Sequence, residues 1–279
     1  MVSDMSVRKC YPGGYPKAFS LSYDDGVEQD ARLVEILNRY GLKGTFNLNS
    51  QLMLDGFVWI HESGMPVRRL PLELALPLYA GHEIASHSMT HPFLHTLPEE
   101  EVFQQLWEDK RQLEELFGRP IAGFALPFTD YNDTIARCAE KCGFEYVRIS
   151  QESGNFDPIQ HRFYRRAGMF HLRPELGDFV KTFLNTNQEL ALCQIVGHSY
   201  DLDVADLWSE MENIFRLVSR NPDVICMTNL ELVRYLDAME RAVISDYEII
   251  NPTNMELWFR AGEQVLALRP GERIRYDNL

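Results

Sequence analysis

The sequence predicts an α/β fold: a parallel (β/α) barrel of about seven strands, closed or nearly closed, with a small C-terminal β-hairpin extension. Short apolar runs alternate along the chain with longer segments whose apolar residues recur at helical spacing. Such alternation favours parallel strands joined by right-handed crossovers. With 279 residues, 45% of them hydrophobic, the chain is long enough for one large α/β domain with an appendage. Polar signatures directly follow several predicted strands, and the strand ends of a barrel meet at one rim, where such folds build active sites.

Predicted strands and helices alternate through most of the chain. The strands are residues 18–23, 44–48, 82–86, 121–126, 146–149, 192–196 and 224–227. The helices are residues 31–40, 98–117, 131–142, 204–219 and 229–240. The first helix ends before Gly41, a residue typical of helix C-termini. We therefore expect the helices to connect parallel strands.

Two regions depart from this alternation. Residues 50–72 are rich in glycine and proline and predict an excursion at the rim of the barrel. Near the C-terminus, strand-like runs at 255–260 and 265–269 flank a glycine-containing turn, which is typical of a β-hairpin. Because an independent module of about 35 residues is marginally stable, we expect a barrel domain over residues 1–245 and a hairpin extension over 246–279 that packs on the barrel.

Composition narrows the classes of partner. The net charge of −14 repels phosphate backbones and anionic membranes, so we expect neither nucleic acid nor a membrane as a partner. No run of about 18 apolar residues predicts a membrane helix, and no apolar N-terminal core predicts a signal peptide. Five scattered cysteines are typical of reduced thiols that pack in a core. We therefore predict a cytoplasmic location.

Two histidines follow the predicted strand 82–86, in His87-Ser88-Met89-Thr90-His91. On one helical turn, residues at i and i+4 lie on one face about 6 Å apart at Cβ, and two imidazoles so placed can reach one divalent ion. Pro92 disfavours the α conformation before it, so the turn is expected to end at His91. Two unrelated surface histidines are an equally common interpretation of this pattern.

Asp24 and Asp25 follow the strand 18–23 and precede Gly26. One carboxylate can complete a two-histidine, one-carboxylate metal site, and the other can act as a general base. Adjacent carboxylates repel, however, and successive extended side chains point opposite ways. On its own the pair is more often a solvated turn in which Gly26 supplies a positive φ.

His198 follows the strand 192–196 and Gly197. A histidine in such a position is a candidate general acid for an amine or alkoxide leaving group. A structural histidine whose hydrogen bonds are satisfied is the alternative.

The order of these motifs resembles that of the polysaccharide deacetylase family with the NodB-homology domain, or carbohydrate esterase family 4. The three motifs are Tyr23-Asp24-Asp25-Gly26, His87-Ser88-Met89-Thr90-His91 and a strand that ends in Gly197-His198. Flanking segments that resemble the family are Lys43-Gly44-Thr45-Phe46, Gly81-His82-Glu83-Ile84-Ala85-Ser86 and Gly123-Phe124-Ala125-Leu126-Pro127-Phe128. The resemblance covers about residues 15 to 240. It implies a distorted parallel (β/α) barrel.

The resemblance also implies roles for individual residues. By position, the ligands of one divalent metal ion look like Asp25, His87 and His91, with Zn as the first candidate and Co, Ni or Mn as alternatives. Asp24 looks like the catalytic base and His198 like the general acid. The backbone N–H of Phe128 matches the group that helps the metal hold the oxyanion.

One position departs from the family pattern. Where the family has an arginine that orients the catalytic aspartate, this chain has Ala125. Without a cation, Asp24 is expected to be less well oriented and to have a higher pKa. The candidates to supply the missing charge from another strand are Arg148, Arg165 and Arg166.

The carboxylate that pairs with His198 is not identified by the family pattern. Asp157 and Asp178 are equal candidates for it. Asp201 and Asp203 lie closer along the chain and either bind sugar hydroxyls or tune His198, although Asp203 is more typical of a cap on the helix that follows.

His82 is expected to pack within its strand, and the histidines at positions 61, 95, 161 and 171 are interpreted as structural or surface residues. The rim aromatics Phe57, Trp59 and Tyr200 either stack on sugar rings or pack in the rim itself.

The sequence therefore predicts a metal-dependent hydrolase that removes acetyl groups from N- or O-acetylated carbohydrate, acting on carbon–nitrogen bonds other than peptide bonds. An acetylated sugar or a soluble oligosaccharide is the expected substrate. One alternative is a hydrolase of a small non-sugar amide on the same fold, and another is a catalytically silent sugar-binding protein. Five converging polar groups count against a silent protein, which has no physical need for them.

Overall fold

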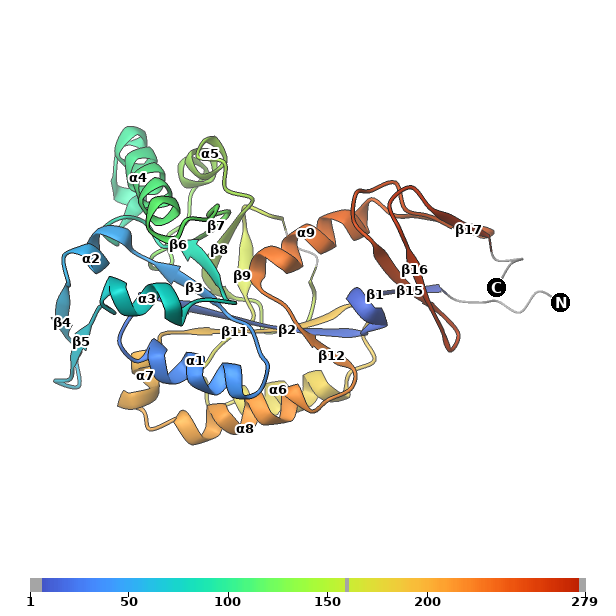
Figure 1. Cartoon of the computed structure of the whole chain (residues 1–279), viewed down its shortest axis with the longest axis horizontal. Coiled ribbons are helices and arrows are strands. Elements are labelled where there is room, and N and C mark those ends of the chain that lie inside the picture. Colours follow the sequence, from blue (N-terminus) through green and yellow to red (C-terminus); the bar gives the residue numbers. More distant parts are fainter. Residues whose placement is uncertain (1–6, 159–160, 276–279) are drawn as a thin grey trace.

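A nine-stranded parallel sheet forms the centre of the computed structural model, which describes residues 7–158 and 161–275 (Figure 1). The strand order is β10-β11-β2-β3-β6-β7-β8-β9, with β12 also paired to β2. The strands are β2 (Lys17–Asp24), β3 (Thr45–Leu48), β6 (Glu83–Ser86), β7 (Gly123–Ala125), β8 (Tyr146–Glu152), β9 (Arg165–Ala167), β10 (Met169–Phe170), β11 (Ala191–Gly197) and β12 (Val224–Cys226). Seven of them were predicted from their apolar runs, and the short strands β9 and β10 are additional.

The barrel is distorted at β2, the longest strand in its centre. One edge of β2 pairs with β11 from Lys17 to Tyr23. The other edge is shared, because β12 pairs with its first three residues and β3 pairs with Ser22 to Asp24. The two ends of the strand order, β9 and β10, are joined by Gly168. Gly168 lies so close to the backbone carbonyl of Gln194 in β11 that a Cβ atom would not fit. The sheet therefore nearly closes on itself, which confirms the predicted fold class.

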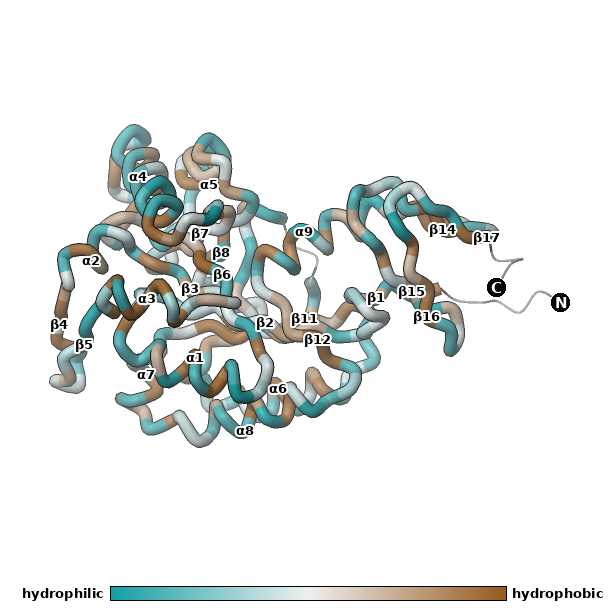
Figure 2. Tube along the Cα trace, viewed as in Figure 1, coloured by the Kyte–Doolittle hydropathy of each residue, from teal (hydrophilic) through white to brown (hydrophobic). Residues whose placement is uncertain are grey.

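Helices cover the outside of the sheet and bury their apolar faces against it. The longer ones are α1 (Asp30–Arg39), α4 (Glu99–Phe117), α5 (Asp133–Lys141), α6 (Leu176–Asn185), α8 (Trp208–Ser219) and α9 (Asn229–Glu240). In Figure 1, α1, α6 and α8 lie on one side of the sheet, and α4 and α5 on the opposite side. Figure 2 shows brown apolar and teal polar positions alternating along α4, as its amphipathic sequence requires.

The predicted single helix over residues 204–219 is wrong. The chain forms a short helix α7 (Ser199–Val204) and a separate α8. Asp206 between them has a left-handed φ of 53°, and the N–H of Leu207 turns back to the carbonyl of Leu202. A non-glycine residue in this conformation ends a helix locally. Asp203 accepts a hydrogen bond from the indole N–H of Trp208 and does not cap the backbone of α8 as predicted.

The predicted rim excursion folds into a small hairpin between two short helices. It contains α2 (Ser50–Leu54), the antiparallel pair β4 (Val58–Ile60) and β5 (Pro66–Arg68), and α3 (Leu72–Leu78). The hairpin packs through Val67, Trp59 and Met65 on Val27 and Tyr200. It therefore lies next to the loop that follows β2.

Beyond α9 the chain forms antiparallel strands, as predicted for the C-terminal hairpin (Figure 1). β15 (Leu257–Ala261) and β16 (Gln264–Leu268) form that hairpin, and β1 (Val7–Cys10) pairs with the other edge of β15. A second small sheet contains β13 (Val243–Ile244), β14 (Glu248–Ile250) and β17 (Arg273–Arg275). We propose that the predicted extension, described over residues 246–275, is joined to a barrel domain that ends near residue 245 by an apolar cluster shared with α9. The outer ends of the two predicted ranges, residues 1–6 and 276–279, lie outside the described residues.

Short 3₁₀ turns at Pro12–Gly14 and Leu94–Thr96 complete the secondary structure. All five cysteines are free thiols. No helix in residues 7–158 and 161–275 has the length and apolar character needed to cross a bilayer.

Truncating Phe259 to alanine is expected to lower the free energy of unfolding by about 3–5 kcal/mol, because its side chain is 0% exposed in the cluster that joins the extension to α9. Denaturant titration followed by circular dichroism measures this value. Val265→Ala is the matched control, since Val265 on the neighbouring strand is 39% exposed and its truncation should cost within about 0.5 kcal/mol. Two separate transitions in the unmodified protein would instead show that the extension unfolds on its own.

Candidate metal centre

Asp24 and Asp25 are buried at the end of β2, so the solvated-turn interpretation is wrong. They are 6% and 5% exposed. Asp25 has a left-handed φ of 84°, and its N–H donates to the carbonyl of Asn47 at 2.9 Å. This turn lets two successive carboxylates remain inside the same rim, which extended backbone would not allow.

His87 and His91 lie in a loop after β6 and not on the helical turn that their spacing suggested. Ser88 and His91 both have left-handed φ values, of 64° and 55°. The side-chain amide of Asn49 donates to the carbonyls of His87 and Ser88, at 2.6 and 2.8 Å. These contacts bring the two imidazoles together, with ring centroids 4.8 Å apart.

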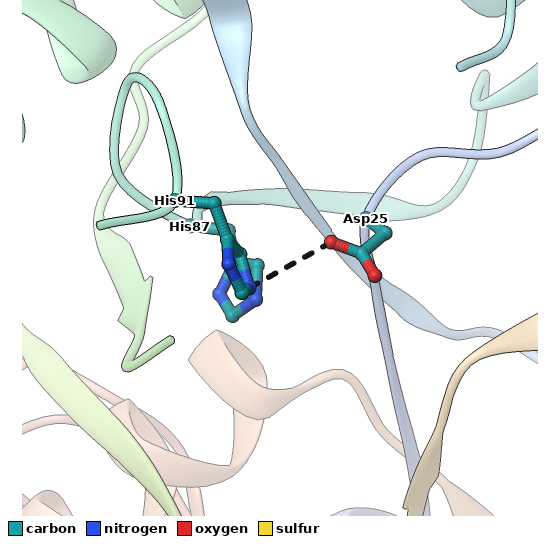
Figure 3. A group of neighbouring side chains, drawn as sticks. All are labelled: Asp25, His87 and His91. Carbon is teal, nitrogen blue, oxygen red and sulfur yellow. Dashed lines mark ion pairs between the residues drawn. The ribbon is translucent and has the colours of Figure 1, made fainter. Parts of the chain in front are cut away.

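Donor atoms from Asp25, His87 and His91 all lie within 4.8 Å of one another. Figure 3 shows the two imidazoles side by side, facing the carboxylate across the 3.9 Å contact between His91 Nε2 and Asp25 Oδ1. His87 Nδ1 is 2.8 Å from the carbonyl oxygen of Ala125, an arrangement in which Nδ1–H donates and Nε2 keeps its lone pair. Burial lowers the pKa of His87 to about 4, against the opposing effect of Asp24, so this imidazole is neutral at pH 7. A carboxylate and two neutral imidazoles fit the donor preferences of Zn²⁺ and similar ions.

Arg148 supplies the positive charge beside Asp24 that the resemblance implied at position 125, where this chain has alanine. Its buried guanidinium donates to Asp24 Oδ1, and the side-chain amide of Asn47 donates to the same oxygen at 2.7 Å. Burial raises the pKa of Asp24, but Arg148 and the neighbouring histidines outweigh it and leave the pKa below its usual value. The expectation of a raised pKa for Asp24 is therefore wrong, and of the three candidate arginines the two on β9, Arg165 and Arg166, lie one strand further away.

His198 pairs with Asp201, and not with Asp157 or Asp178. Its Nδ1 lies 3.0 Å from Asp201 Oδ2, and its Nε2 lies 4.0 Å from Asp25 Oδ2. Asp178 instead forms an exposed ion pair on α6, and Asp157 is exposed in the loop before β9. The spacing contained the signal, because a carboxylate three residues into a helix can turn back to a histidine at its N-terminus.

Three neighbouring carboxylates, led by Asp201, favour the protonated form of His198. Burial lowers the pKa of His198, but the hydrogen bond to Asp201 and the charges of Asp25 and Asp24 outweigh it and raise the pKa to about 9. In the same way the histidines overcome the effect of burial on Asp201 and lower its pKa to about 2. His198 is therefore a protonated donor at neutral pH.

Sequence reasoning did not identify a role for His171, which is buried behind His198. It lies 3.3 Å from Asp201 Oδ2 through Nε2 and 3.1 Å from the hydroxyl of Tyr23 through Nδ1. A side chain at Gly197 would collide with its ring. His171 thus fixes the carboxylate that pairs with His198, and no local motif marks it.

Arg69 is a second buried arginine that the sequence pattern did not reveal. It follows the hairpin β4–β5 and forms a 3.0 Å ion pair with Asp25 Oδ1. Burial raises the pKa of Asp25, but Arg69 and the histidines outweigh it and hold the pKa well below its usual value. The two aspartates therefore have one buried arginine each.

Phe128 has a left-handed φ of 58° at the carboxyl end of β7. Its ring stacks on Phe93 at 3.8 Å between centroids and meets the edge of His91 at 4.6 Å. Its carbonyl accepts a 2.7 Å hydrogen bond from the Ser150 hydroxyl. Phe128 thus lies at the mouth of the site with a strained backbone, and whether its N–H faces a substrate stays a prediction.

A buried carboxyl, Asp30, lies behind the site at the start of α1. It is 0% exposed and accepts hydrogen bonds from the hydroxyls of Tyr79, at 2.6 Å, and Ser199, at 2.5 Å. Burial raises the pKa of Asp30 to about 7, because these hydrogen bonds only partly offset the loss of hydration. Since Ser199 adjoins His198, Asp30 joins α1 to the segment that carries the candidate acid.

Residues 13–147 match the family model for polysaccharide deacetylases, a span that includes Asp24, Asp25, His87 and His91 but ends before His198. A chitin deacetylase from Pestalotiopsis sp is 30% identical over 143 residues, or 51% of this chain and 44% of the relative. The chain spans between 25% and 55% of the length of the curated relatives that it matches.

Solved structures show the same fold. A putative polysaccharide deacetylase from Mycobacterium smegmatis superposes with a TM-score of 0.59 at 16% identity, covering 85% of this chain and 95% of that chain. A CE4 family pseudoenzyme from Bacillus anthracis superposes with a TM-score of 0.54 at 18% identity, covering 81% and 68%. At these identities the likeness establishes the architecture alone.

Replacing Asp30 with asparagine is expected to change how stability depends on pH. The folded pKa of about 7 lies above the unfolded value of about 3.9, so the stabilising contribution is present below pH 4 and is lost as pH rises through 7. The stability of the unmodified protein relative to Asp30→Asn should therefore fall by about 2–4 kcal/mol across this window. Denaturation at several pH values measures the difference, with the exposed Asp178→Asn as control. Parallel curves for the unmodified protein and Asp30→Asn would refute the raised pKa.

Proposed function

Because the chain belongs to the polysaccharide deacetylase family, we propose that it is a metal-dependent hydrolase that removes an acetyl group from an N- or O-acetylated carbohydrate. The observation that carries the proposal is the convergence of Asp25, His87 and His91 within 4.8 Å. Two further groups flank these donors: Asp24, whose Oδ2 lies 3.9 Å from His87 Nε2, and His198. Metal-assisted hydrolysis of an acetyl group uses a Lewis acid, a base and an acid in one place.

In this proposal the metal ligands are Asp25, His87 and His91. A bound divalent ion such as Zn²⁺, Co²⁺, Ni²⁺ or Mn²⁺ would act as a Lewis acid that polarises the acetyl carbonyl and makes a water easier to deprotonate. Three protein ligands leave coordination positions open, as catalytic sites require.

Asp24 acts as the general base. The ion pair with Arg148 and the hydrogen bond from Asn47 occupy Oδ1, which leaves Oδ2 to accept the proton of the attacking water. As the water oxygen adds to the acetyl carbon, negative charge develops on the carbonyl oxygen. The backbone N–H of Phe128 is proposed to donate a hydrogen bond to that oxygen.

His198 acts as the general acid. When the bond between the acetyl carbon and the sugar nitrogen or oxygen breaks, its electron pair remains on the leaving atom, which takes a proton from Nε2 of His198. Asp201 holds Nδ1 and favours the protonated ring. Acetate and the free amine or alcohol are the products.

An acetylated sugar or oligosaccharide is the proposed substrate, by analogy with the deacetylases that the chain resembles. The exposed rings of Phe93 and Phe128, 51% and 39% exposed, form an apolar shelf beside His91. Such aromatic faces offer apolar contact area next to the polar centre.

The direct test is metal content combined with acetate release. The purified protein should contain or bind one divalent ion per chain, and Asp25→Ala and His87→Ala should lose it. Asp24→Asn should keep the ion and lower kcat by about 10²–10⁴-fold, since it removes only the base. The exposed His161→Ala is the control and should change neither value. Metal-loaded protein that releases no acetate from a panel of N- and O-acetylated mono- and oligosaccharides would refute the sugar assignment.

Asp201→Asn should shift the alkaline limb of the kcat–pH profile to lower pH. His198 donates a proton only while it is protonated, and the Asp201 carboxylate raises its pKa to about 9, so removing that charge lowers the pKa. We expect kcat at pH 8 to fall by about tenfold or more. Asp203→Asn is the control, because this exposed carboxylate binds Trp208 instead of His198. An unchanged alkaline limb in Asp201→Asn would assign the acid to another group.

A further inference from the structure

The side chain of Arg69 binds both the backbone carbonyl and the carboxylate of Asp25. One guanidinium nitrogen, Nη1, donates to the backbone carbonyl of Asp25 and to Oδ1, the latter at 3.0 Å. The Arg69 side chain is 4% exposed and the Asp25 side chain 7%. Neither group is therefore available to solvent, and the contact is part of the interior of the rim.

Backbone hydrogen bonds on either side of Arg69 fix its position at the end of the rim hairpin. The N–H of Glu28 donates to the carbonyl of Arg68 at 3.0 Å, and the N–H of Leu70 donates to the carbonyl of Gly26 at 2.8 Å. These bonds pair residues 68–70 with the loop that carries Asp25. The guanidinium also lies over the ring of Trp59 in β4, 4.9 Å from its centroid. Backbone and side chain together hold Arg69 in a single place.

Asp25 needs such support because its backbone has a left-handed φ of 84°. A non-glycine residue persists in that conformation only where its surroundings impose it. Its N–H is bound by the carbonyl of Asn47, and its carbonyl is bound by Arg69. Without Arg69 the carbonyl loses this partner, and the carboxylate loses the donor that sets its direction.

We infer that Arg69 is a positioning residue that orients Asp25 for metal binding and so couples the rim hairpin to the metal centre. The inference rests on the proposed function, in which Asp25 is a metal ligand. Two effects of Arg69 oppose each other: its positive charge repels a divalent cation, whereas its hydrogen bonds fix the carboxylate. Because carboxylates that bind metals depend on their own hydrogen bonds for orientation, we expect the positioning effect to be the larger of the two.

The test measures zinc affinity and not catalysis. Zn²⁺ is titrated into metal-free protein in competition with a chromophoric chelator, for the unmodified protein, Arg69→Met and Arg69→Lys. Arg69→Met should raise the zinc Kd by about 10–100-fold. Arg69→Lys keeps the charge but replaces the rigid guanidinium with a flexible ammonium group, so it should raise the Kd by a smaller factor, about 3–10-fold. Visible absorption of the Co²⁺-loaded proteins should change in the same order, because it responds to the geometry of the ligands.

Arg68→Met is the matched control, since Arg68 is the neighbouring arginine on the same hairpin but is exposed. Its zinc Kd should stay within about twofold of that of the unmodified protein. Thermal unfolding of the metal-free variants separates loss of metal affinity from loss of the fold, and where Arg69→Met does not fold, Arg69→Lys decides the question.

The outcomes distinguish the inference from the proposed function. If the unmodified protein binds no Zn²⁺ or Co²⁺, the metal site itself falls. If it binds and folded Arg69→Met binds equally well or more tightly, Arg69 acts only through its charge or its packing, and the positioning role is overturned. If Arg69→Met is weaker by tenfold or more while Arg68→Met is unchanged, the positioning role stands.

Discussion

Two adjacent carboxylates buried at the end of one strand are the constraint that organises this rim. Burying an unpaired carboxylate costs several kcal/mol, and two neighbours add mutual repulsion. The chain meets this cost by bringing one buried arginine to each aspartate: Arg148 comes from the barrel strand β8, and Arg69 from the hairpin outside the barrel. The sheet and the rim excursion therefore meet at Asp24 and Asp25. Removal of either arginine leaves a buried negative charge with weakened compensation.

Backbone strain is concentrated at the same place. Of the six non-glycine residues with left-handed φ in the described ranges 7–158 and 161–275, four line the site: Asp25, Ser88, His91 and Phe128. Each such residue costs of order 1 kcal/mol or more, and persists where neighbours over-determine it. Buried side chains support these segments: the amide of Asn47 binds Asp24, the amide of Asn49 binds the carbonyl of His87, and Asp109 accepts hydrogen bonds from Ser50 and Ser86. The strained loops therefore lower local stability, but they bring together side chains from three separate strand ends.

The sequence predicted the barrel because alternation and helical spacing are local signals, and it located the motifs because each directly follows a strand. The pairing and register of the strands could not be predicted from the sequence in the same way. Ala125 occupies the position where the family has its arginine, and in the parallel register of β7 and β8 its partner is Arg148. A guanidinium on the neighbouring strand thus reaches the carboxylate for which the resemblance implied an arginine at position 125. Only the register distinguishes Arg148 from Arg165 and Arg166, and no pattern along one chain contains it. By contrast, α6 was missed although Leu176, Phe179, Val180 and Phe183 recur at helical spacing.

Fold and family together do not decide whether a member is active, because a CE4 family pseudoenzyme shares this architecture. The free energy needed to bury the charged groups of the rim bears on this question. Buried ion pairs are often neutral or unfavourable for stability compared with apolar side chains of the same size. Stability alone therefore does not require the pair of Asp24 and Arg148, because joint replacement of both by apolar side chains of similar size is often neutral or stabilising. This chain has both aspartates, the two imidazoles and the His198–Asp201 pair, and Arg148 places a positive charge beside Asp24. A replacement that restores the same charge beside the same carboxylate is expected where the chemistry of that carboxylate still matters.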